Sequence, residues 1–193
     1  MKKSALLLSA ALISGALAQT PPPAVPVNHD FDFWLGDWNV TTPDGKPAGT
    51  NRIESVSGGR GLYENWEGAA SPNGQPGGSG KSLNAFNPAK HQWQQFWIGS
   101  GGNVLELAGG LIEGKMVLTS EERPLRDGRK ISNRISWTPN ADGSVRQFWE
   151  QSVDGGKTWT AAFDGRYVKK TPKTAASGGG GGESPRRIYF LFW

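Results

Sequence analysis

The sequence contains no cysteine, and it has no long apolar segment after its N-terminal residues. Without cysteine there can be no disulfide, so burial must stabilise the fold, and nine tryptophans and eight phenylalanines are available for that. A lipid-anchored bacterial lipoprotein is also excluded, because no cysteine follows the apolar N-terminal stretch. No other segment has the length of a membrane helix, so we expect no membrane span.

The N-terminal residues have the pattern of a secretory signal peptide. Lys2 and Lys3 precede an apolar stretch that is too short to span a bilayer, and this stretch ends in Ala16-Leu17-Ala18. Residues 1–18 therefore predict a signal peptide that is cleaved near Ala18. The expected location is periplasmic or secreted, in a bacterium.

Two further segments differ in composition from the rest of the chain. Residues 19–28 are rich in proline and predict an extended leader. Residues 169–193 combine a glycine-rich linker with the hydrophobic tail Ile188 to Trp193. The folded domain is therefore expected within residues 29–168.

The net charge does not indicate nucleic-acid binding. The chain carries +4 at neutral pH, but Lys2 and Lys3 contribute +2 and the tail after Val168 contributes another +4. The body from Gln19 to Val168 is left with −2, so it lacks the basic surface that phosphate backbones require. We expect no nucleic-acid partner.

Short runs of β-branched and aromatic residues, separated by glycine and proline, predict an all-β fold. No window longer than a turn or two keeps a helical period. About ten strands joined by tight turns favour a single antiparallel up-and-down barrel, because closure removes unpaired edges; an open sandwich is the alternative. The predicted strands are 38–42, 48–56, 61–69, 81–87, 91–98, 103–109, 115–122, 129–138, 144–153 and 158–168.

The segment from Phe31 to Trp38, with the sequence FDFWLGDW, predicts how the barrel begins. Its first aromatic residues suggest a short helical turn that plugs one end of the barrel. Gly36 would let the chain bend tightly into the first strand, and Trp38 would seal the floor.

This start resembles the Gly-x-Trp signature of the lipocalin-like (calycin) superfamily. Together with the segments 64–66 (ENW) and 149–159 (WEQSVDGGKTW), it is similar to a family of secreted bacterial proteins of unknown function. The resemblance covers about Asp30 to Tyr167. It implies a lipocalin-like barrel but no activity. In lipocalins an arginine of a late strand stacks over the tryptophan, which would make Arg166 the partner of Trp38.

Some lipocalin-like barrels bind haem through a histidine of a late strand. Here His29 directly follows the leader and His91 begins a middle strand, so no axial ligand is expected. No group of histidines and carboxylates has the spacing of metal ligands. We therefore predict no cofactor and no metal.

Function in a barrel depends on polar side chains that share a face with large apolar ones. Period two places Glu64 between Leu62 and Trp66 on a face expected to point inward, where a carboxylate must be paired or hydrogen-bonded. Four other strands interleave polar and apolar residues in the same way. The candidate ligand-binding residues are Glu64, Trp66, Asn84, Gln95, Trp97, Asn133 and Gln147.

Which face of a strand points inward stays open where both faces hold aromatic residues, as in residues 94–97 (QQFW) and 146–149 (RQFW). Arg134 and Glu150 could therefore replace Asn133 and Gln147 as inward groups.

Three functions are compatible with this interior, and no recognisable catalytic motif decides between them. Amides interleaved with tryptophans are typical of a pocket for a small apolar or aromatic ligand, so a binding barrel is the first prediction. The second is a hydrolase or isomerase in which Glu64, with a raised pKa, acts as acid or base. The third is a structural or interaction protein whose barrel is filled and whose hydrophobic tail is the functional part.

Overall fold

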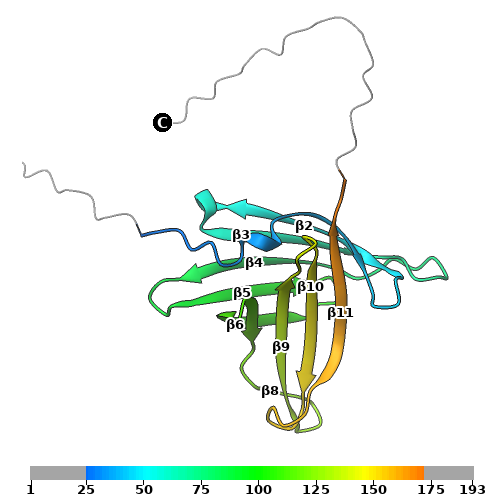
Figure 1. The fold of residues 1–193 in the computed structure, drawn as a ribbon. Coiled ribbons are helices and arrows are strands. Elements are labelled where there is room, and N and C mark those ends of the chain that lie inside the picture. Colours follow the sequence, from blue (N-terminus) through cyan, green and yellow to red (C-terminus); the bar gives the residue numbers. More distant parts are fainter. Residues whose placement is uncertain (1–24, 172–193) are drawn as a thin grey trace, which may run out of the picture.

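A computed structural model describes residues 25–171 (Figure 1), so the predicted signal peptide, most of the leader and nearly all of the linker and tail lie outside the described residues. In the described part, no helix has the length and apolarity of a membrane span. The elements are η1 (Asp32–Trp34), β1 (Gly36–Thr41), β2 (Pro47–Val56), η2 (Ser57–Gly59), β3 (Gly61–Gly68), β4 (Ser79–Asn87), β5 (Gln92–Gly99), β6 (Val104–Ile112), β7 (Lys115–Thr119), β8 (Arg123–Pro124), β9 (Lys130–Pro139), β10 (Val145–Ser152) and β11 (Thr160–Lys169).

Ten of these strands close into an antiparallel barrel. Strands β1 to β7 pair in chain order, β7 pairs with β9, and β10 and β11 lead back to β1 (Figure 1). The short β8 is an additional strand that pairs with β9. The prediction of an all-β up-and-down barrel with a short N-terminal helical turn is therefore confirmed.

Tight turns make this meander possible, and several of them need glycine. In the β9–β10 turn, Gly143 has a φ of 79°, and its amide donates to the carbonyl of Asn140 at 3.0 Å. In the β10–β11 turn, Asp154 accepts hydrogen bonds from the amides of Lys157 and Thr158 at 3.0 and 2.9 Å. Both turns follow from their Asp-Gly sequences, because glycine adopts positive φ and the aspartate carboxylate accepts nearby amides.

The N-terminal turn η1 closes one end of the barrel, as predicted. Phe31 and Trp34 are fully buried, and their rings stack with centroids 5.0 Å apart. Both rings pack against Trp137 of β9, at 5.1 and 5.2 Å. Gly36 bends the chain into β1 with a φ of 133°, and the Trp38 indole donates to the carbonyl of Trp34 at 2.9 Å. This end of the barrel is a solid aromatic cluster.

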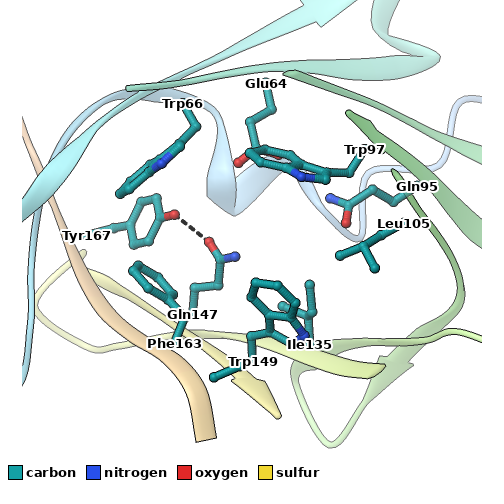
Figure 2. A pocket seen from close by; sticks show the side chains of 11 residues that line it. Glu64, Trp66, Gln95, Trp97, Leu105, Ile135, Gln147, Trp149, Phe163 and Tyr167 are labelled. Carbon is teal, nitrogen blue, oxygen red and sulfur yellow. Dashed lines mark hydrogen bonds between the residues drawn. The ribbon is translucent and has the colours of Figure 1, made fainter. Parts of the chain in front are cut away.

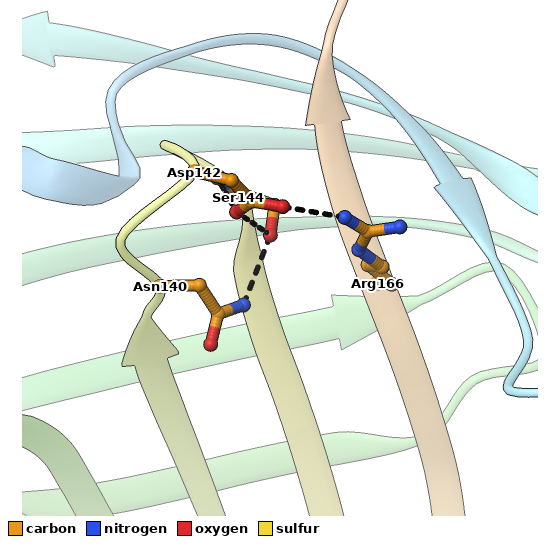
Figure 3. Close-up of polar contacts among 4 residues, drawn as sticks. All are labelled: Asn140, Asp142, Ser144 and Arg166. Carbon is orange, nitrogen blue, oxygen red and sulfur yellow. Dashed lines mark hydrogen bonds and ion pairs between the residues drawn. The ribbon is translucent and has the colours of Figure 1, made fainter.

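The predicted stacking of Arg166 over Trp38 is wrong. In the β1–β11 pairing Arg166 lies opposite Thr41, while Trp38 lies opposite Lys169, so Arg166 is on the outer face of the barrel. There its guanidinium forms an ion pair with Asp142 at 2.6 Å (Figure 3). The cation nearest the Trp38 ring is Lys169, whose Nζ lies 5.3 Å from the ring centroid.

Candidate ligand-binding cavity

An open cavity of about 170 Å³ lies on the inner side of the barrel wall, and Figure 2 shows the side chains around it. It borders the aromatic cluster, because Tyr167 contacts Trp34 and Trp38 of that cluster and also lines the cavity. The lining residues are Glu64, Trp66, Gln95, Trp97, Leu105, Ile135, Gln147, Trp149, Ala162, Phe163 and Tyr167.

Five of the seven candidate residues line this cavity, namely Glu64, Trp66, Gln95, Trp97 and Gln147. The other two, Asn84 and Asn133, are buried on the same inward faces but hold neighbouring groups in place. Asn133 accepts hydrogen bonds from the indole of Trp149 at 2.9 Å and from Gln151 at 3.1 Å.

The structure resolves which side chains of β9 and β10 point inward. Ile135 of β9 and Gln147 and Trp149 of β10 line the cavity. Their strand neighbours Arg134 and Glu150 therefore lie on the other face of the sheet. There Arg134 and Glu150 form an ion pair at 3.0 Å, and the Arg134 guanidinium lies 4.2 Å from the ring centroid of Trp159.

Aromatic rings form the walls of the cavity, and glycines beside them make room for the rings. Trp66 and Phe163 meet edge to face, with centroids 5.8 Å apart. The Trp97 ring lies against Gly80, where a Cβ atom would be 2.1 Å from the ring. Phe163 covers Gly165 in the same way, at 2.6 Å. A larger residue at these glycines would push the rings from their places.

The polar floor of the cavity is built around Glu64 of β3. This side chain is 3% exposed, and its carboxylate accepts a hydrogen bond from Asn51 of β2 at 2.7 Å and one from Ser82 of β4 at 2.6 Å. The Ser82 hydroxyl in turn accepts from Asn84 at 2.9 Å, and Asn84 accepts from Gln95 at 2.8 Å. Four strands therefore contribute to one hydrogen-bonded network.

Burial in these surroundings raises the pKa of Glu64 from its usual 4.5 to about 7, although the hydrogen bonds from Ser82 and Asn51 oppose the shift. Tyr167 is the other titratable group of the cavity. Burial, and then the nearby Glu64 charge, raise its pKa well above the ordinary value. Its hydroxyl donates to Gln147 (Figure 2) and accepts from Asn51 at 3.4 Å. Tyr167 is thus neutral at physiological pH.

The sequence interpretation missed several contributors to this site. Asn51, Leu105, Ala162, Phe163 and Tyr167 were not among the candidates. For Phe163 and Tyr167 the signal was present, because Phe163-x-Gly165-x-Tyr167 shows the same period-two alternation as the chosen strands. Ala162 and its neighbour Phe163 both line the cavity, because the β10–β11 register shifts between Trp149 and Glu150. No local sequence pattern shows such a shift.

The two histidines do not contribute to the cavity. His29 contacts the carboxylate of Asp32 at 2.7 Å near η1, and His91 is exposed in the turn before β5. Among residues 25–171, no group of three or more histidine or carboxylate side chains is placed to hold a metal ion.

Fold and site together define an all-β antiparallel barrel with a buried aromatic cluster and an adjoining cavity. No family model matches the chain, and no curated protein sequence matches it.

Proposed function

We propose that the protein is an exported, lipocalin-like barrel that binds a small, partly apolar ligand in this cavity. The observation that carries the proposal is the composition of the lining, in which aromatic walls surround a few convergent polar groups. Such a lining suits ligands that stack on rings and form hydrogen bonds at one end.

The volume of the cavity indicates the size of the ligand group that it can hold. An engineered apolar cavity of roughly 150 Å³ holds one benzene molecule. The cavity here is about 170 Å³, so it fits a ligand of about one ring.

Two sequence features support export and the lipocalin-like assignment. The basic and apolar residues before Ala18 support export, to the periplasm or the medium. The Gly36-x-Trp38 start, with Trp38 buried beside η1, supports the lipocalin-like assignment. A cleaved N-terminus in the protein recovered from bacterial periplasm would test export.

Tryptophan fluorescence during titration with small ring compounds tests the binding function. We expect saturable changes that are lost in Trp66→Ala and Trp97→Ala, because these indoles line the cavity. Trp159→Ala is the matched control, since Trp159 packs under Arg134 on the other face. Binding that survives both cavity substitutions would remove this cavity from the proposal.

Acid–base catalysis by Glu64 is the second candidate function. It is favoured because Glu64 lines the cavity and has a pKa of about 7, where a carboxyl group can both take up and release a proton. A screen for hydrolase and isomerase activity tests it, with Glu64→Gln as the comparison. Turnover that is unchanged in Glu64→Gln would rule out this role.

A further inference from the structure

We propose that the ligand of this cavity is a small organic cation, a protonated or quaternary amine of about one ring in size, with its charge beside Glu64. This inference rests on the binding function proposed above and adds the chemical class of the ligand. It follows from the charge of the floor, the direction of the hydrogen bonds and the nature of the walls.

The charge of the cavity lining favours a cation. Glu64 is the one acidic residue among the lining residues, which include no lysine, arginine or histidine. None of the ion pairs within residues 25–171 involves Glu64, and its two hydrogen-bond donors, Asn51 and Ser82, are neutral. A buried carboxylate without a cation is costly, and a cation that enters the cavity offsets this cost.

The hydrogen bonds around Glu64 share one direction. Gln95 donates to Asn84, Asn84 donates to Ser82, and Ser82 donates to Glu64, while Asn51 donates to the other carboxylate oxygen. Each of these four hydrogen bonds therefore runs toward Glu64. The Ser82 hydroxyl uses its one proton on Glu64 and accepts from amides, so this network suits the ionised carboxylate rather than the acid.

The walls of the cavity are aromatic. The rings of Trp66, Trp97, Trp149 and Phe163 surround the space below Glu64 (Figure 2). The face of an aromatic ring attracts a cation, most strongly for tryptophan and where water is excluded. An anion would meet repulsion from both the carboxylate and the ring faces, and a neutral ligand would leave Glu64 uncompensated. Walls and floor therefore favour the same sign of charge.

Three probes with one phenyl ring and similar size but different charge test the inference at about pH 8: benzylammonium, neutral benzyl alcohol and anionic benzoate. Isothermal titration with the mature protein is expected to give a Kd for benzylammonium about tenfold or more below that for benzyl alcohol, with benzoate weakest. In Glu64→Gln this preference should fall to less than about threefold. Glu67→Gln, which alters an exposed carboxylate of the same strand, should keep it.

A pH series on the unmodified protein gives a second test that does not depend on a variant. Five groups of β2, β4, β5 and β11 pack around Glu64, namely Asn51, Ser82, Asn84, Gln95 and Tyr167. Of these, only Tyr167 titrates, and it stays neutral below pH 8. Protonation of Glu64 between about pH 8 and about pH 5 should therefore weaken benzylammonium binding at least tenfold and leave benzyl alcohol binding unchanged.

The outcomes separate this inference from the binding function. Benzyl alcohol that binds as tightly as benzylammonium, or a preference that does not change with pH, would overturn the cationic ligand while the binding function stands. If none of the three probes binds and no ring compound changes the tryptophan fluorescence of the protein, the binding function fails, and this inference fails with it.

Discussion

Glu64 is a carboxylate buried among neutral partners, and this makes the stability of the protein depend on pH. Its pKa is about 7 in the folded state and 4.5 in the ordinary case, so between these values the folded state binds more protons than the unfolded state. The free energy of unfolding should therefore fall as pH rises through this window, by about 3 kcal/mol in total, and should level off above it.

Urea unfolding at about pH 5 and about pH 8 measures this difference. Glu64→Gln should remove most of it, because the glutamine does not ionise, whereas Glu67→Gln should retain it. Asp142 and Asp154 do not interfere, since hydrogen bonds lower their pKa values to about 2, below the window. An equal pH dependence in Glu64→Gln and in the unmodified protein would show that another group causes it.

Contacts between neighbouring strands fix the cavity walls, and Gly80 of β4 offers a direct test. A Cβ atom at Gly80 would lie 2.1 Å from the Trp97 ring of β5, so Gly80→Ala must displace that ring. We expect binding of ring compounds to weaken about tenfold or more, because the indole moves toward the cavity. Overpacking should also lower the free energy of unfolding by about 1–3 kcal/mol.

Gly110→Ala is the matched control for this substitution. Gly110 lies within β6, and an added Cβ atom there would meet no atom within 4 Å. Binding should stay within about twofold of the unmodified protein, since the cavity walls are not touched. Ring-compound affinity that is the same in Gly80→Ala as in Gly110→Ala would show that Trp97 does not depend on Gly80 for its position.

Strands and their inward faces could be predicted from the sequence, because they follow from local patterns. Period-two alternation placed Glu64 and Trp97 on inward faces, and glycine turns gave the meander. Pairings between distant strands could not be predicted in this way. Arg166 and Lys169 are both cations of β11, and only the register against β1 decides which one lies over Trp38.

The interior of the barrel is divided into two parts. At the η1 end, the cluster of Phe31, Trp34, Trp38 and Trp137 is fully buried and leaves no room for a ligand. In the other part, the rings of Trp66, Trp97, Trp149 and Phe163 are only partly buried and border the cavity. The open pocket and the filled core that the sequence left as alternatives are therefore both present, in different parts of one barrel.

This division predicts different effects for the same substitution in the two parts. Trp34→Ala should lower the free energy of unfolding by about 3–5 kcal/mol, because it leaves a hole among fully packed rings. Trp66→Ala should cost less than about half of that and act mainly on ligand binding, because its indole already borders open space. Urea unfolding of both variants, with ring-compound titration of Trp66→Ala, measures the contrast. Equal losses of stability would show that the cavity walls belong to the core and that the interior is not divided.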